Sequence, residues 1–165
     1  MSEYLIASVA EDTKTDSLSI TSLVVTYDGT NSPKIKHYFK SSKGSSSVKN
    51  VYFEFENFVF SHQNSTLAFW GKFHFEKLKE MSQKVNGDFL DLFDQDEALN
   101  LQFMFKERLN MKRFVGFRDA YTKISGLRLL FSEKDRDFSS LENMANFIPY
   151  VLGDKRINRI DFKKK

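Results

Sequence analysis

Carboxylates, histidines and hydroxyls are the side chains of this chain that could carry chemistry, because the sequence contains no cysteine. The lack of cysteine excludes disulfides, thiolate zinc sites and cysteine nucleophiles together. The three histidines are far apart in the sequence, and none forms the H-x-x-x-H pair of a helical metal site: His37, His62 and His74. Neither a glycine-rich phosphate loop nor a G-x-S-x-G turn is present. We therefore expect no cofactor, no nucleotide-driven activity and no serine hydrolase.

The densest group of carboxylates lies in residues 88–97 and comprises Asp88, Asp91, Asp94, Asp96 and Glu97. Hard cations prefer such oxygen ligands, but an EF-hand loop also needs a central glycine and a glutamate at its twelfth position. Both are missing here. Helix capping and a solvated turn explain the group better, so we expect no metal site in it.

The excess of positive charge lies at the C-terminus. The whole chain carries +3, yet residues 153–165 hold six basic residues against two acidic ones. We therefore divide the chain into a domain over residues 1–152 and a basic tail over residues 153–165. Lys155, Arg156 and Arg159 of the tail are candidate phosphate contacts, whereas composition alone indicates no basic face on the domain.

Strand patterns dominate the first part of the chain. Residues 4–9 form a buried apolar run, and residues 18–27 and 35–39 are β-branched or alternating, which predicts an antiparallel meander. Residues 66–70 predict a fourth strand. Residues 127–131 fit either a short fifth strand or an apolar loop.

Helical patterns dominate the rest. The predicted helices cover residues 51–59, 75–85, 98–109, 116–125 and 139–152. Two capping boxes, Asp94 with Glu97 and Ser139 with Glu142, would begin the third and the last of them. Strands followed by helices, with one strand after the first helix, predict a mixed sheet covered by helices. A length of 165 residues predicts one domain. No segment is apolar enough to cross a bilayer, so we expect a cytoplasmic protein without a membrane partner.

A string in the middle of the chain carries a resemblance. Residues 70–78 read W-G-K-F-H-F-E-K-L, which resembles the W-G-x-[FY]-D-x-x-x-L segment of the DnaQ-like (DEDDh) 3′-to-5′ exonucleases, particularly their ERI-like branch. Further fragments follow in the family's order, from the first strand at residues 4–10, through F-L-D-L at 89–92 and V-G-F-R-D-A at 115–120, to F-S-S-L-E-N-M-A-N at 138–146. The resemblance covers residues 4–152 and implies a ribonuclease H-like (exonuclease-type) α/β fold. In that fold residues 4–9 are central in a mixed five-stranded sheet flanked by helices, with residues 18–27 antiparallel beside them.

The residues that would do this family's chemistry are changed. The family holds two metal ions with four carboxylates and activates water with a histidine. The corresponding positions here are Ser8 and Ala10 for the first acidic pair, His74 for the second-motif aspartate, Phe138 for the histidine and Asn143 for the last aspartate. A shifted alignment would place Glu11 rather than Ala10 at the glutamate position. The resemblance thus implies a catalytically inactive member, with Trp70 in the core and His74 neutral or hydrogen-bonded.

Three functional classes remain open. A binding module for single-stranded nucleic acid would use an inherited groove with Lys72 and Lys77, assisted by the tail. A protein-interaction or regulatory subunit would fit the nearly neutral domain. An active metal-dependent 3′-to-5′ exonuclease would need relocated ligands, for which the candidates are Glu11, Asp12, Asp91 and Glu142.

Overall fold

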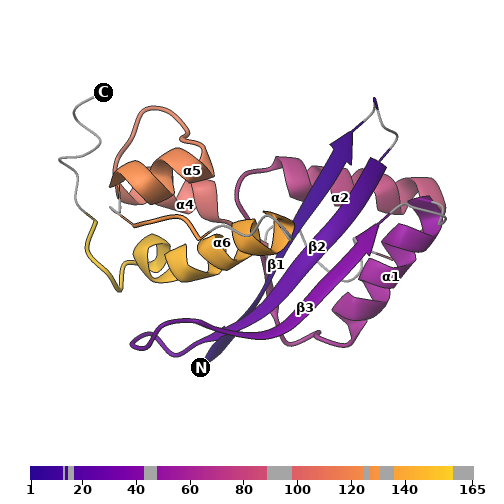
Figure 1. Cartoon of the computed structure of the whole chain (residues 1–165), viewed down its shortest axis with the longest axis horizontal. Helices are drawn as coiled ribbons and strands as arrows, with labels where there is room; N and C mark the ends of the chain where they lie inside the picture. The colour runs from indigo at the N-terminus through magenta and orange to yellow at the C-terminus, as the bar shows by residue number, and fades with distance from the viewer. Residues whose placement is uncertain are drawn as a thin grey trace.

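The chain forms a five-stranded mixed sheet with strand order β3-β2-β1-β4-β5 (Figure 1). The structure, a computed structural model, describes residues 1–12, 14, 17–42, 48–88, 98–124, 127–130 and 136–157. The strands are β1 (Ser2–Asp12), β2 (Ser17–Tyr27), β3 (Lys34–Ser42), β4 (Thr66–Phe69) and β5 (Leu99–Asn100). β2 is antiparallel to both β1 and β3, whereas β4 is parallel to both β1 and β5.

β1 is central because it has apolar side chains on both faces. Leu5, Ala7 and Val9 enter one core cluster, and Tyr4 and Ile6 enter the other. Successive side chains of a strand point to opposite faces, so a nearly continuous apolar run is stable only where both faces are covered.

Helices cover both faces of the sheet. α1 (Val48–Phe60) and α2 (Phe73–Val85) pack on the face of Leu5 and Val9. α4 (Leu101–Arg108), η1 (Ala120–Ile124, a π-helix) and α6 (Arg136–Leu152) contribute to the core on the face of Tyr4 and Ile6, and α5 (Phe117–Asp119) leads into η1. This is a ribonuclease H-like topology, and the predicted fold class is confirmed.

Two local predictions are corrected, and one that was left open is decided. The fifth strand is β5, and residues 127–130, which fit either a short strand or an apolar loop, form no strand. Ala98 does not begin a helix, because β5 intervenes and Asn100 caps α4 by accepting a hydrogen bond from the Phe103 N–H. α6 begins at Arg136 and buries Ser139 within it, so Ser139 is not its N-cap. Asp94 and Glu97, the other predicted capping pair, lie outside the described residues.

The first residues after α6 stay close to the sheet. The Tyr27 hydroxyl donates a hydrogen bond of 2.9 Å to the Asp154 carboxylate. Burial and this neighbouring carboxylate raise the pKa of Tyr27 to about 12. Residues 153–157 are thus attached to the domain, while Arg159 and the rest of the basic tail lie outside the described residues. Within the described part of the chain, no helix is long and apolar enough to span a membrane.

Candidate nucleic-acid interface

His74 closes the end of the central strand. It lies in the first turn of α2, and its Nδ1 accepts a hydrogen bond of 3.0 Å from the Val9 N–H. The pairing of β1 with β4 ends at Ile6, so β4 offers no carbonyl to this N–H. Burial lowers the pKa of His74, which favours the neutral ring that this bond requires. The predicted hydrogen-bonded role of His74 is confirmed.

The residues expected at the first acidic pair of the exonuclease motif are neighbours of Val9 on β1. Ser8 and Ala10 flank Val9 on the opposite side of the strand, and Ser8 is partly buried whereas Ala10 is exposed. Glu11 forms an ion pair of 2.6 Å with Lys77 of α2. Its carboxylate is therefore already neutralised by a cation, and the pKa of Lys77 is raised by the hydrogen bond to Glu11.

Phe138 and Asn143, which the resemblance compares with a catalytic histidine and aspartate, support the packing of α6. The Asn143 amide accepts a hydrogen bond of 2.8 Å from the Leu130 N–H and donates one of 2.9 Å to the Leu130 carbonyl. Phe138 packs edge-on against Tyr38 of β3, with 5.0 Å between the ring centroids. Asn143 thus satisfies the backbone of residue 130, and Phe138 is part of the contact between α6 and the sheet.

The described residues contain no group of three or more histidines and carboxylates that could hold a metal ion. Asp91, one of the candidates for a relocated ligand, lies outside them, as do Asp94, Asp96 and Glu97 of the acidic group. Asp12 accepts a hydrogen bond from the Lys14 N–H. The structure therefore joins His74 to the end of β1 without assembling a set of anionic ligands there.

The Trp70-Gly71 pair brings three separate segments together. Trp70 is buried, as predicted, and its Nε1 donates to the Val115 carbonyl, which also accepts from the Gln102 side chain. Gly71 has a φ of +90°, and a Cβ there would lie 2.9 Å from the Gln102 side-chain oxygen. The left-handed backbone favours glycine here, and any larger residue would also require the Gln102 side chain to move.

Exposed phenylalanines alternate with cations where these segments meet. Phe73 is 61% exposed, Phe103 48% and Phe114 53%. The Lys106 ammonium lies 4.7 Å from the Phe114 ring centroid, which is a cation–π contact. We call this the Phe-Lys surface, and its members are Lys72, Phe73, Phe103, Lys106, Lys112, Arg113 and Phe114.

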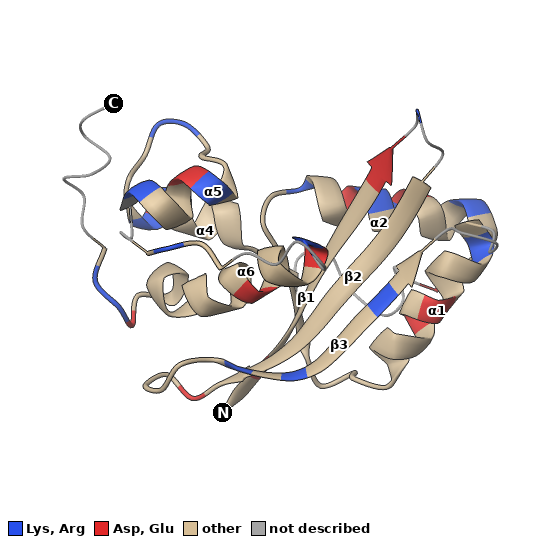
Figure 2. Cartoon of the chain, in the orientation of Figure 1, with Lys and Arg blue, Asp and Glu red and all other residues tan. Residues whose placement is uncertain are grey.

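The segment that contributes most of this surface, residues 98–124, carries a local positive charge that the sequence prediction did not include. Residues 98–124 contain six basic residues and two acidic ones. Figure 2 shows the basic residues on the loop after α4 and on α5. The signal was available in the sequence, but counting charge over residues 1–152 as a whole cancelled it against the acidic group at residues 88–97.

The remaining predicted contacts are spread more widely. Lys72 belongs to the Phe-Lys surface, whereas Lys77 is paired with Glu11. In the tail, Arg156 is exposed, and the Lys155 ammonium lies 5.6 Å from the Tyr150 ring centroid.

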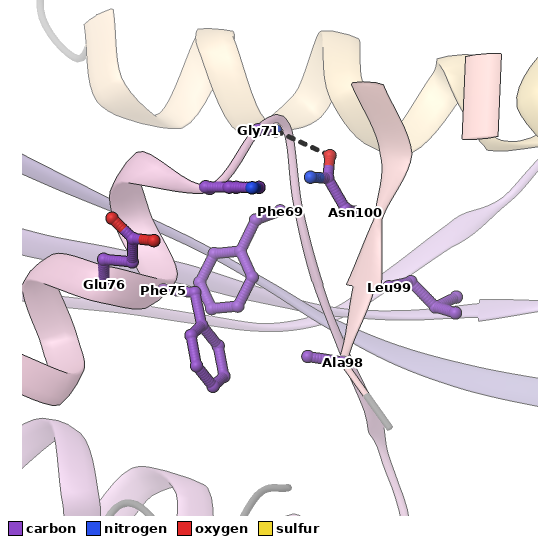
Figure 3. A pocket seen from close by; sticks show the side chains of 8 residues that line it. Phe69, Gly71, Phe75, Glu76, Ala98, Leu99 and Asn100 are labelled. Carbon is purple, nitrogen blue, oxygen red and sulfur yellow. Dashed lines mark hydrogen bonds between the residues drawn. The ribbon is translucent and has the colours of Figure 1, made fainter. Parts of the chain in front are cut away.

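An open pocket adjoins the Phe-Lys surface between β4, the start of α2 and β5 (Figure 3). Its lining residues are Phe69, Gly71, Lys72, Phe75, Glu76, Ala98, Leu99 and Asn100. The Gly71 N–H donates a hydrogen bond of 3.1 Å to the Asn100 side-chain oxygen at its rim. The pocket combines a mostly apolar lining with one amide, one ammonium and one carboxylate.

Comparison with protein-family models, with curated proteins and with solved structures finds no match for this chain. What the sheet order and the flanking helices define is a protein of ribonuclease H-like topology.

Proposed function

We propose that this protein is a catalytically inactive relative of the DnaQ-like exonucleases that binds single-stranded nucleic acid through the Phe-Lys surface. The observation that carries the proposal is that three exposed phenylalanines and four cations lie on the segments that meet at Trp70, Gln102 and Val115. Exposed rings accept stacked bases of any sequence, and cations between them contact the phosphates.

The positions that would be catalytic in the family support inactivity. Two metal ions about 4 Å apart need several anionic ligands. His74 instead accepts the Val9 N–H, and Asn143 binds the backbone of residue 130. Phe138 has no group that could take or deliver a proton. These side chains stabilise the fold at the places where ligands would be needed.

Binding is measured by fluorescence anisotropy with a labelled single strand of about 12 nucleotides. Stacking on one aromatic ring is worth about 1–3 kcal/mol, so Phe103→Ala is expected to weaken binding by roughly fivefold to 150-fold. Phe60→Ala is the matched control, because Phe60 is 42% exposed at the end of α1, away from the Phe-Lys surface. Equal effects of the two variants would contradict the proposal.

The salt dependence tests the cations separately. Each phosphate contact on a single strand contributes about 0.7 to the slope of log K against log salt. Lys112→Ala is expected to reduce the slope by about that amount, whereas Lys36→Ala, an exposed lysine on β3, leaves it unchanged. An absence of binding even at low salt would instead favour a protein partner for the exposed phenylalanines.

A further inference from the structure

The orientation of the Asn100 side chain is fixed by the backbone. Its Oδ1 accepts one hydrogen bond from the Gly71 N–H and another from the Phe103 N–H, each of 3.1 Å. A flipped amide would direct its NH₂ group at two N–H donors, so the nitrogen must occupy the other position. In Figure 3 this nitrogen is turned toward the side of the pocket where Phe69 lies.

The Asn100 amide nitrogen is a donor without a partner among the described residues. Asn100 is only partly buried, so the two N–H bonds remain accessible to a ligand. Lys72 adds a second donor at the pocket, and Glu76, exposed in the first turn of α2, adds an acceptor. Donors thus come from the β5 end and from the β4–α2 turn, and the acceptor comes from α2.

The rest of the lining is apolar. Phe69 and Phe75 are almost fully buried and lie edge-to-face, with 5.7 Å between their ring centroids. Ala98 and Leu99 complete the lining from the β5 side. A pocket of this kind suits a flat ring with polar groups on its edge.

Guanine matches this set of groups. Its O6 and N7 are acceptors, which suit the Lys72 ammonium and the Asn100 amide, and its N2 amino group is a donor, which suits the Glu76 carboxylate. Adenine would place its N6 amino donor toward the two donors of the pocket. Uracil lacks the second ring and the N2 amino group.

We propose that the Asn100 pocket binds a guanine base, so that the protein prefers single strands containing guanine. This inference rests on the proposed function for its biological ligand, because the pocket adjoins the Phe-Lys surface through Lys72, which belongs to both. Binding of the base itself can be measured without a strand.

The direct experiment titrates the ¹⁵N-labelled protein with GMP, AMP and UMP, and follows the side-chain NH₂ signal of Asn100 by NMR. All three nucleotides carry the same phosphate, so a difference between them reports the base. GMP is expected to shift the Asn100 signal and to bind about tenfold more tightly than AMP or UMP. IMP, which lacks the N2 amino group, is expected to bind between GMP and AMP.

Two variants test the pocket. Asn100→Asp keeps the side-chain oxygen that accepts from the Gly71 and Phe103 N–H groups, and aspartate is as good an N-cap as asparagine. The variant replaces the amide NH₂ donor by a second oxygen, which can only accept. It is expected to lose about tenfold in GMP affinity and nothing in AMP affinity. Glu76→Gln is expected to weaken GMP binding likewise, while Glu80→Gln, one turn further along α2 and 53% exposed, leaves it unchanged.

The outcomes separate the two proposals. The guanine pocket is overturned if GMP and AMP bind equally well, or if both Asn100→Asp and Glu76→Gln leave the GMP affinity unchanged. Either result would leave the proposed strand binding by the Phe-Lys surface intact. GMP binding that depends on Asn100, combined with strand binding that is insensitive to Phe103→Ala, would support the pocket and contradict the Phe-Lys surface. If Asn100→Asp does not fold, the exposed Glu76→Gln variant decides the matter.

Discussion

Replacing His74 tests whether this residue stabilises the end of β1. His74→Ala removes the acceptor of the Val9 N–H. Leaving a buried donor without a partner costs about 1–3 kcal/mol, so the free energy of unfolding is expected to fall by that amount at pH 7.5. His74→Gln supplies a side-chain oxygen that can accept the same hydrogen bond, and is expected to lose less.

The stability of the wild-type protein is expected to decrease as the pH falls below 6.5, the ordinary pKa of histidine. Because burial lowers the pKa of His74 in the folded state, the unfolded state binds more protons in this range. The contribution of His74 to the free energy of unfolding is complete above pH 6.5. It is lost at up to about 1.4 kcal/mol per pH unit as the pH falls toward the lower pKa of His74 in the folded state. His74→Gln has no such titration and is expected to show a smaller pH dependence.

Urea unfolding at pH 7.5 and pH 5.5 measures both effects. His62 must be separated, because burial and the neighbouring His37 also lower its pKa. His62→Gln provides this control and should remove a different, additive share of the pH dependence. The reasoning is refuted if His74→Gln retains the full pH dependence of the wild type, or if His74→Ala unfolds at the same urea concentration as the wild type.

Three further predictions concern catalysis, the tail and the core. Labelled single-stranded RNA or DNA is expected to stay intact on a gel when the protein is incubated with magnesium or manganese. The His74→Asp variant is expected not to cleave either. Metal-dependent shortening from the 3′ end that Glu11→Ala abolishes would contradict this prediction. Residues 158–165 carry four basic residues and one acidic one, and deleting them leaves the contact between Tyr27 and Asp154 in place. The deletion is expected to weaken strand binding and to reduce the slope of log K against log salt. An unchanged slope would confine binding to the domain. The Ser22 hydroxyl is fully buried and has no hydrogen-bond partner among the described residues. Ser22→Ala is therefore expected to raise the free energy of unfolding, measured in urea, by up to about 1 kcal/mol. A clear loss of stability would reveal a partner.

Much of the fold could be predicted because its elements have strong local signals. The apolar run at residues 4–9 needs cover on both faces, which makes it a central strand wherever it occurs. The stripe of Phe75, Leu78 and Met81 predicts a helix, and Asn86 ends α2 with the left-handed backbone that asparagine tolerates. These signals depend on residues close together in the sequence.

The short fifth strand and the start of α6 could not be predicted in the same way. β5 has two residues, which is too few for a periodic pattern, and it exists because β4 offers an unpaired edge. Ser139 has the sequence signature of an N-cap, yet it is buried against the core and α6 extends one turn beyond it. In both cases contacts with distant residues outweighed the local preference.

The sequence alone determined that Ser8, Ala10, His74, Phe138 and Asn143 supply no carboxylate, because residue types do not depend on coordinates. Only the tertiary structure decided what those residues do instead: His74 meets Val9, Asn143 meets Leu130, and Glu11 meets Lys77. It also decided that Phe73, Phe103 and Phe114 are exposed on three segments that meet through Trp70, Gln102 and Val115. Such contacts join residues 45 or 65 positions apart, and no local pattern encodes which distant side chain will satisfy a given backbone group.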